Sequence, residues 1–539
     1  MLCVNGKLCN YIMHLFHYTH GIHNRHTFYL IFYMIVIAAD SYMFYSSKIK
    51  KTDKARLLIA ATALLIICIA SAFYNDKDKI WSYIITVVLL LLYLMLVLVR
   101  KKIKYKVWQT ALVSLVVLEL AINFIISFEI SGSDIFSRDT AHKIESVVSK
   151  LDINGLERSV YNDSYIISNV GLIYGYNTCC GFSGNVSFAY SDELNKLGIG
   201  VNDQAVCERG FNSFLSSIFS RKYIFDTKRN SSNDGVTYIS KNDAVFSNCE
   251  KEELNDITLY KNLESVNPIV VPENDIKVYS DYSLNNEANR DKVDDYNNKL
   301  CYSLTGIDSI MSSENADYKL EYSNNCEASI KADKLTITKN EELGDSDETV
   351  ELVLSFVAPK DGEYSIYLFN NINLGYLRAG EKAYAYAGIA GYQFSESNEK
   401  SCDIVLNRLN HDKWLQAYSI LKDNQIDVKE AKAGYIKGTI SADANKQVFS
   451  TISYDRAWKV SVDGKNVPAK RVGNGFLSFD VDAGEHEICM QYKAGGVYLG
   501  IAITIVFIVI SVLMLIYYRK GQESIWLEKD SVTDKTSEE

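Results

Sequence analysis

Long apolar runs lie at the two ends of the chain, and the residues between them are polar with short alternating segments. Four runs come first, at about 28–45, 57–74, 80–99 and 107–128, and a fifth lies at 497–518. Each run approaches or reaches the ~17–25 residues that cross the hydrocarbon core of a bilayer as a helix. The pattern predicts a multi-span α-helical membrane region at 28–128 and a single C-terminal transmembrane helix at 497–518.

Basic residues indicate which connections face the cytoplasm. Five Lys and Arg residues lie in 48–56, five more lie in 100–106, and Arg519 and Lys520 follow the last run. We therefore expect a multi-pass protein of the cell membrane with a cytoplasmic tail at 519–539, disordered because it is polar and charged. The same argument places 1–27, an external interfacial loop, and 129–496 outside the cytoplasm.

The region 129–496 divides into two parts by its pattern. Helical and strand signals are mixed in 129–275, which predicts an extracytoplasmic α/β domain. Alternation of apolar and polar residues dominates 276–496, for example at 328–338 and 349–356, with turn signals such as Asp463-Gly464 between such runs. We expect this second part to be an antiparallel β-sandwich, jelly-roll-like, interrupted by one helix near 412–424.

Composition narrows the possible partners. The 539 residues include 56 basic and 66 acidic ones, for a net charge of −10, whereas a nucleic-acid surface needs clustered Lys and Arg. No nucleic-acid partner is expected. Eleven cysteines are too few for a disulfide scaffold. Histidines recur at every third position from 14 to 26, but that step drifts by about 60° each time around a helix, so neither a metal nor a cofactor is predicted.

Polar side chains in or beside the apolar runs are the candidate site residues, because an ionisable group in a span is costly and by default suggests function. Glu119 and Asn123 are four residues apart in the run 107–128, so they share one face of a helix. Arg25 precedes the first run, where its side chain could pair with a lipid phosphate or extend to the headgroups. The three residues are candidates for a lipid or sugar pocket. For Glu119 the alternative is a hydrogen bond that packs two helices.

Three short motifs carry a resemblance to a known family. In chain order they are APKDGEY at 358–364, YDRAWKVSVDGK at 454–465, and AGEH at 483–486, which begins the strand before the last apolar run. In this order the motifs resemble the C-terminal part of YfhO-like bacterial membrane proteins, which are grouped with GT-C-type glycosyltransferases. The resemblance implies transfer of a sugar from a polyprenyl-phosphate-linked donor to an envelope glycopolymer such as teichoic acid, with membrane lipids as further partners.

The chain also departs from that family. The early external loop in which GT-C enzymes carry their catalytic carboxylate has no counterpart here, so no catalytic residue is transferred. The resemblance therefore implies a truncated or split member, with an upstream polypeptide as a possible partner that supplies the missing spans.

Two further interpretations stay open. One is a non-enzymatic, membrane-anchored glycan-binding or scaffold protein. Aromatic rings stack on sugars, and the tyrosines of the outer region, such as Tyr176, Tyr384 and Tyr386, could form such a face or simply pack the sandwich. The other interpretation is a truncated, inactive fragment.

Overall fold

The computed structural model describes Ile59, Thr62, Ala63 and Ile66, and then the ranges 80–99, 102–131, 138–151, 155–161, 170–179, 181–182, 187–202, 205–206, 210–227, 249–254, 257–340, 349–390 and 398–535. The chain forms two units, Met1–Phe136 and Ser137–Glu539, and each is described by itself. The predicted run 28–45 and most of the run 57–74 lie outside the described residues.

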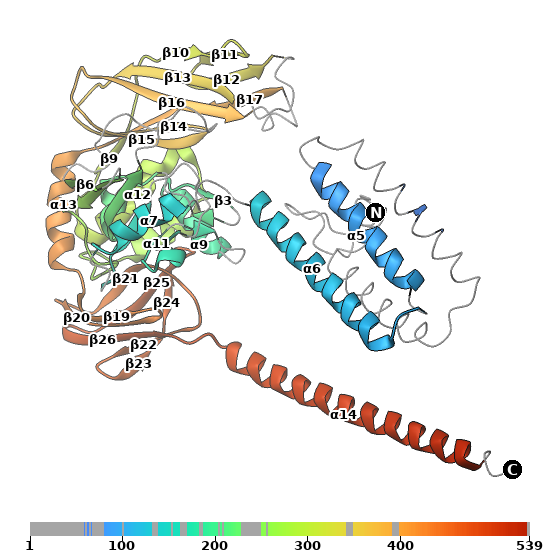
Figure 1. The fold of residues 1–539 in the computed structure, drawn as a ribbon. Helices are drawn as coiled ribbons and strands as arrows, with labels where there is room; N and C mark the ends of the chain where they lie inside the picture. The colour runs from blue at the N-terminus through green and yellow to red at the C-terminus, as the bar shows by residue number, and fades with distance from the viewer. Residues whose placement is uncertain are drawn as a thin grey trace. The chain divides into compact units, whose positions relative to one another are not determined.

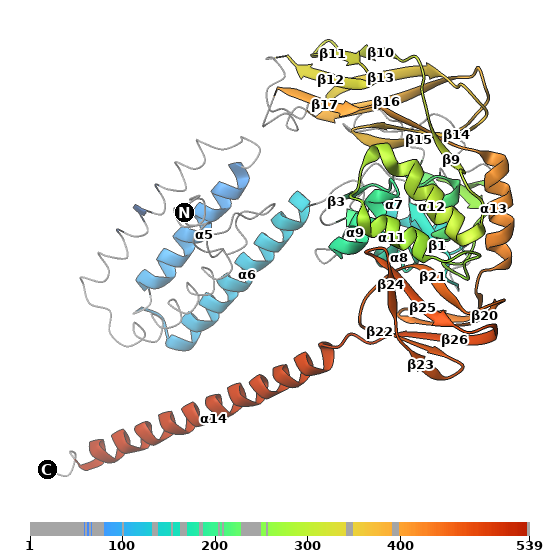
Figure 2. The same cartoon turned by 180° about the vertical axis from the view of Figure 1, so that it is seen from behind.

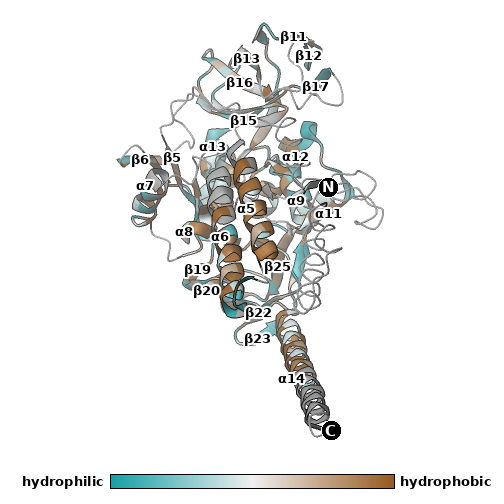
Figure 3. Cartoon of the chain, turned by 45° about the vertical axis from the view of Figure 1, so that its right-hand side comes forward, coloured by the Kyte–Doolittle hydropathy of each residue, from teal (hydrophilic) through white to brown (hydrophobic). Residues whose placement is uncertain are grey.

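Two apolar helices pack together in the first unit (Figure 3). They are α5 (Ile80–Val99) and α6 (Tyr105–Ser131), at the predicted runs 80–99 and 107–128. The indole Nε1 of Trp108 donates to the backbone oxygen of Leu96 at 2.9 Å, which ties the start of α6 to the end of α5. Both helices leave large apolar side chains exposed, and these include Val88, Met95, Val113, Val117 and Leu120. Exposed apolar surface of this kind is typical of a partner or lipid contact.

The chain ends in a long helix, α14 (Val497–Lys535). Its segment Val497–Tyr517 is, within the described residues, the one stretch both long and apolar enough to cross a membrane, while Ile84–Val99 is a shorter apolar helix. The predicted C-terminal apolar helix is confirmed, and the multi-span region stays a prediction. Residues 519–535, which we expected to be disordered, continue the helix. Good helix formers such as Gln522, Glu523 and Glu528 extend a helix that is already nucleated.

The second unit contains a central core of helices and a mixed sheet (Figures 1 and 2). Its helices are α7 (Arg138–Val148), α8 (Val170–Tyr174), α9 (Phe188–Lys196), α10 (Ser213–Ile218), α11 (Lys277–Asn285), η4 (Arg290–Lys292), α12 (Val293–Thr305) and α13 (His411–Asp423). Its strands are β1 (Arg158–Tyr161), β2 (Gly181–Phe182), β3 (Val201–Asn202), β4 (Ala205–Val206), β5 (Arg221–Thr227), β6 (Cys249–Leu254) and β7 (Ile257–Asn262). The order β1-β5-β7-β6 is parallel between β1 and β5 and antiparallel elsewhere. Ile144 and Val147 of α7 share a hydrophobic core with Phe225 and Leu259 of this sheet.

The first β module covers 311–409. Its strands are β9 (Met311–Glu314), β10 (Lys319–Tyr322), β11 (Cys326–Lys331), β12 (Lys334–Lys339), β13 (Thr349–Val357), β14 (Gly362–Leu368), β15 (Asn370–Leu377), β16 (Lys382–Ala390), β17 (Glu399–Asp403) and β18 (Val405–Leu409). They pair in the orders β15-β14-β18-β9, β10-β13-β16 and β11-β12-β17. The alternating run at 328–338 is a hairpin of β11 and β12, because Ala332 and Asp333 both adopt positive φ and reverse the chain.

The second β module combines β8 (Ile269–Val270) with strands after α13. These are β19 (Asp427–Lys432), β20 (Tyr435–Ala442), β21 (Lys446–Ser453), β22 (Trp458–Val462), β23 (Lys465–Val467), β24 (Lys470–Val472), β25 (Phe476–Val481) and β26 (Gly484–Tyr492). They pair in the orders β19-β20-β26-β22-β23 and β24-β25-β21-β8. The antiparallel strands expected in 276–496 are confirmed, but they surround two separate hydrophobic cores, and α11 and α12 of the same region belong to the central core.

A turn of the second β module is inserted against α9 of the central core. Glu193 of α9 is fully buried, and its carboxylate accepts hydrogen bonds from Tyr279 Oη at 2.6 Å and Ser283 Oγ at 2.9 Å. The backbone N–H of Asn474, between β24 and β25, donates to the same carboxylate at 2.8 Å. A buried carboxylate is costly unless its oxygens are bonded, so these donors stabilise the joint. Gly473 has φ +54°, and a Cβ there would lie 2.3 Å from Glu193 Oε1, so the turn requires a residue without a side chain.

We expect Gly473→Ala to loosen the second β module. The left-handed conformation costs an alanine ~1–2 kcal/mol, and displacement of Glu193 adds about 1–3 kcal/mol for a buried hydrogen-bonding group that loses its partner. Hydrogen–deuterium exchange of β25 and β26 in the detergent-solubilised full chain measures the loss of local stability. The matched control is Gly464→Ala, because Gly464 has φ +75° and no atom within 4 Å of an added Cβ. Equal losses in the two variants would show that the contact with Glu193 contributes nothing.

Candidate functional site

The sequence-predicted site residue Glu119 has a hydrogen-bond partner on the neighbouring helix. Its Oε2 accepts a hydrogen bond from Tyr93 Oη of α5 at 2.5 Å, and the Glu119 side chain is partly buried. The sequence argument did not identify Tyr93. The signal was present, because Tyr93 is a hydroxyl-bearing residue inside the otherwise apolar run 87–99.

The described structure does not show where the side chains of the other two predicted site residues lie. Asn123 lies on α6, but its side chain is outside the described residues, and so is Arg25. Their roles in a lipid or sugar pocket stay predictions. The hydrogen bond between Glu119 and Tyr93 is also the contact that a purely helix-packing role requires.

The pair has a chemistry of its own. A carboxylate with little water around it can hold or accept a proton from a hydroxyl group within hydrogen-bond reach. Tyr93 donates such a bond, so it orients the carboxylate of Glu119. The geometry therefore fits a hydrogen-bond acceptor or a general base.

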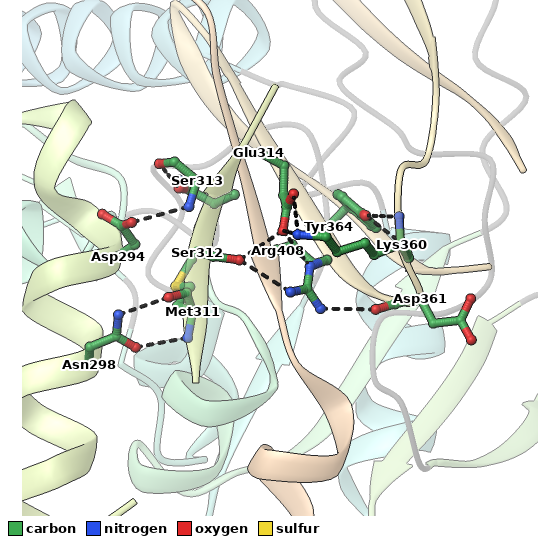
Figure 4. Close-up of polar contacts among 11 residues, drawn as sticks. Asp294, Asn298, Met311, Ser312, Ser313, Glu314, Lys360, Asp361, Tyr364 and Arg408 are labelled. Atoms are coloured by element: carbon green, nitrogen blue, oxygen red, sulfur yellow. Dashed lines mark hydrogen bonds and ion pairs between the residues drawn. The ribbon is translucent and has the colours of Figure 1, made fainter. Parts of the chain in front are cut away.

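A second polar cluster lies in the first β module (Figure 4). Glu314 of β9 accepts a hydrogen bond from Arg408 Nε of β18 at 2.7 Å, and Lys360 Nζ lies 3.2 Å from the same carboxylate. Arg408 also donates to the backbone oxygen of Asp361 at 3.1 Å. Burial raises the pKa of Glu314, but the hydrogen bonds from Arg408 and Lys360 outweigh it and hold this pKa below its ordinary value. The cluster therefore stabilises the fold above the ordinary carboxyl pKa, and this contribution is lost as the pH falls through the lowered one.

The motif APKDGEY builds the turn that enters β14. Tyr364 Oη donates to the backbone oxygen of Lys360 at 2.8 Å, and Asp361 Oδ1 accepts from the backbone N–H of Ala379 at 2.7 Å. Lys360 and Asp361 thus close the turn on both sides. In these contacts the motif stabilises the fold of the first β module.

Glu363, in the same motif, joins the first β module to the central core. Its side chain is buried, and both carboxylate oxygens lie 3.2 Å from the backbone nitrogen of Ser213 at the start of α10. Asn373 Nδ2 donates to Glu363 Oε1 at 3.2 Å. Burial raises the pKa of Glu363 above its ordinary value although the hydrogen bonds from Ser213 and Asn373 lower it.

The helix α12 supports β9 from the central core (Figure 4). Asn298 donates to the backbone oxygen of Met311 and accepts from its backbone N–H, both at 2.8 Å. The carboxylate of Asp294 accepts from the backbone N–H of Ser313 at 3.1 Å. These side chains pair with β9 much as a neighbouring strand would, so the edge of the sheet is covered.

Two tyrosines stand in a row on the outer face of the sheet β10-β13-β16. Tyr384 is 44% exposed and Tyr386 is partly buried. Ala383, which precedes Tyr384, and Ala385, which lies between the two tyrosines, are buried in the core. Residues two apart on a strand lie about 6.6–6.8 Å apart on one face. Lys382 Nζ lies 4.8 Å from the centre of the Tyr384 ring. The pair can stack on successive sugar rings, whereas Tyr176, 6% exposed, packs in the central core.

Metal ligands are not gathered in the part of the chain that the structure describes. No group of three or more His, Cys, Asp or Glu residues is placed to hold an ion there. The histidines from 14 to 26 lie outside the described residues.

Glu363→Ala should destabilise the contact between α10 and β14 by ~1–3 kcal/mol, because it removes the carboxylate that accepts from the buried backbone N–H of Ser213. Glu363→Gln should be less harmful, since its amide oxygen can still accept from Ser213. Hydrogen–deuterium exchange of α10 and β14 in the full chain measures both effects.

Because the pKa of Glu363 is raised, the exchange protection of α10 and β14 should depend on pH. In the wild type, the protection should fall as the pH rises from the ordinary carboxyl pKa through the raised one, because the charged form is the one that burial disfavours. Glu363→Gln should remove this dependence. A pH profile that is unchanged in Glu363→Gln would contradict the assignment.

Comparison with known proteins assigns the chain to a family. The family model described as bacterial membrane protein YfhO matches residues 1–379 and 389–504, which include all three motifs. No curated protein matches the chain. Because the family model covers nearly the whole chain, the protein belongs to the YfhO family of bacterial membrane proteins.

Proposed function

We propose that the protein takes part in the transfer of a sugar from a polyprenyl-phosphate-linked donor to a glycopolymer of the bacterial envelope, such as teichoic acid. The observation that carries the proposal is the pairing of Glu119 with Tyr93 between two apolar helices. Transfer to a hydroxyl requires a carboxylate that orients or deprotonates the acceptor, and a lipid-linked donor requires that this carboxylate lie at the membrane.

The proposal includes a topology. The runs 28–45 and 57–74, together with α5, α6 and α14, cross the cell membrane, and 129–496 lies outside the cytoplasm. The exposed apolar side chains of α5, α6 and α14 support lipid contact, and the basic residues at 48–56 and 100–106 support the orientation. In this arrangement Arg25 lies at the outer surface, where it would pair with the donor phosphate, and Asn123 would bind the sugar beside Glu119.

The first β module would hold the acceptor. Tyr384 is exposed and Tyr386 is partly exposed on the same face of the sheet, and Lys382 adds a positive charge beside Tyr384. A glycopolymer with anionic phosphates matches both features.

The second candidate is a non-enzymatic, membrane-anchored glycan-binding protein. The tyrosine face favours it as well, because binding requires that face and does not require Glu119. The two functions are therefore separated by the effect of Glu119 on sugar transfer.

Glu119→Gln should reduce the sugar content of the envelope glycopolymer at least ~100-fold, as expected for loss of a general base. The measurement is nuclear magnetic resonance of the glycopolymer from cells in which each variant replaces the native gene. Tyr93→Phe keeps the carboxylate and should cause a smaller loss. Ser114→Ala, an exposed position on α6, is the matched control and should have no effect. Full sugar content in Glu119→Gln, with wild-type protein levels, would exclude the enzymatic role of this residue.

Replacing Tyr384 and Tyr386 together by alanine should weaken binding of purified glycopolymer to the full chain by roughly 5- to 150-fold, because each aromatic contact contributes about 0.5–1.5 kcal/mol. Calorimetry in detergent measures the Kd. The control is Tyr322→Ala, since Tyr322 is also exposed but lies opposite Leu352, on the other side of the pleat. Equal Kd values for all three proteins would contradict a glycan-binding face.

A further inference from the structure

The strand that leads into α14 ends between two turns of the second β module. The backbone N–H of Tyr492 donates to the oxygen of Gly434 at 2.7 Å, and that of Lys493 donates to the oxygen of Ala457 at 2.9 Å. The rings of Trp458 and Tyr492 meet edge to face, with centres 5.3 Å apart. The loop 454–457 and the end of β26 are therefore one ordered surface, which we call the rim; it comprises residues 454–459, 492 and 493.

The rim cannot lie far from the apolar helix. Only residues 493–496 separate Tyr492 from Val497, where the apolar segment of α14 begins. Five steps between successive Cα atoms span at most about 18 Å, whatever the direction of α14. The headgroup layer on each side of a bilayer is about 5–8 Å deep, so a membrane-inserted α14 brings the rim within reach of lipid headgroups.

The rim has the charge that such a surface requires. Arg456, Lys459 and Lys493 are exposed, and within the described residues no ion pair holds the side chains of Arg456 and Lys493. The carboxylate of Asp455 is held on the loop, because it accepts from the backbone N–H of Ala457 at 2.7 Å and from Tyr492 Oη at 3.3 Å. With Asp455 counted, the rim carries three positive side chains and one negative side chain, a net charge of +2.

The aromatic residues of the rim suit the same place. Trp458 and Tyr492 are each partly exposed, and each joins an apolar ring to a polar N–H or hydroxyl group. Residues of this kind are enriched where a membrane meets water. Tyr498, in the first turn of α14, is 83% exposed and continues the aromatic surface into the helix.

We propose that the rim binds the phosphate groups of anionic phospholipids in the membrane that α14 crosses. Arg456 and Lys493 supply the main charge–phosphate contacts, and Trp458 and Tyr492 lie at the level of the headgroups. The site rests on the proposed function for one point, the crossing of the membrane by α14, and it is independent of any role of Glu119. It gives a physical role to the motif YDRAWKVSVDGK, which builds the loop.

The test is photocrosslinking of the full chain in nanodiscs. The discs contain phosphatidylcholine and a fraction of phosphatidylglycerol that carries a photoactivatable group on its headgroup, and mass spectrometry maps the modified peptides. We expect crosslinks at 454–459 and 492–493. The variant Arg456→Ala with Lys493→Ala should reduce them by at least about fivefold, because each basic residue near an anionic surface contributes appreciably to binding.

The matched control is Lys331→Ala with Lys334→Ala, which removes two exposed lysines from the β11–β12 hairpin and should leave the crosslinks unchanged. Crosslinks in 497–517 without any in 454–459 would overturn the proposal and leave the membrane crossing intact. Absence of crosslinks in both segments would overturn the crossing and the rim together. Loss of the rim crosslinks on addition of millimolar glycerol phosphate would assign the cations to soluble phosphate groups and would also overturn lipid binding.

Discussion

Two buried carboxylates, Glu193 and Glu363, hold the β modules to the central core, and each does so by accepting a backbone N–H from across the joint. Glu363 of the first module accepts from Ser213 of α10, and Glu193 of α9 accepts from Asn474 of the second module. A polar group is stable away from water only when it is hydrogen-bonded. Such a carboxylate therefore enforces one arrangement of the two parts, because any displacement leaves it without its donors.

The motifs that identify the family lie in these joints and turns. Residues 358–364 close the entry to β14 and contain Glu363, while 454–465 form the loop and hairpin next to the start of α14. In the hairpin, Asp463 accepts from the backbone N–H of Glu487 and lies 2.7 Å from His486 of the third motif. The distinctive residues of the second unit thus position its modules. The polar pair that suggests chemistry, Glu119 with Tyr93, lies in a part of the chain with no such motif.

Single helices and hairpins could be predicted from the sequence, but pairings between strands far apart in the chain could not. Alternation located the β11–β12 hairpin and β13, and helical periodicity located α13, because each signal lies within about ten residues. The division into two β cores depends on pairings such as β9 with β18 and β8 with β21, which join distant residues. At the candidate site, Glu119 could be identified because it is an acidic residue in an apolar run. The burial of Glu193 and Glu363 had no sequence signal, since an acidic residue in a polar segment is ordinarily exposed.

The joints also connect the two surfaces to which we assign ligands. The central core includes Met311 and Leu409 of the first β module and Phe449, Val472 and Phe476 of the second, so both modules contribute side chains to it. In the proposed function, a polymer held at the tyrosine face and a lipid held at the rim would therefore be bound by one body. Because close-packed interiors transmit strain, a change at Glu193 or Glu363 would alter the relation between the two proposed ligand surfaces even when both are intact. If the proposed function holds, the buried carboxylates would help to set where the acceptor polymer lies relative to the membrane.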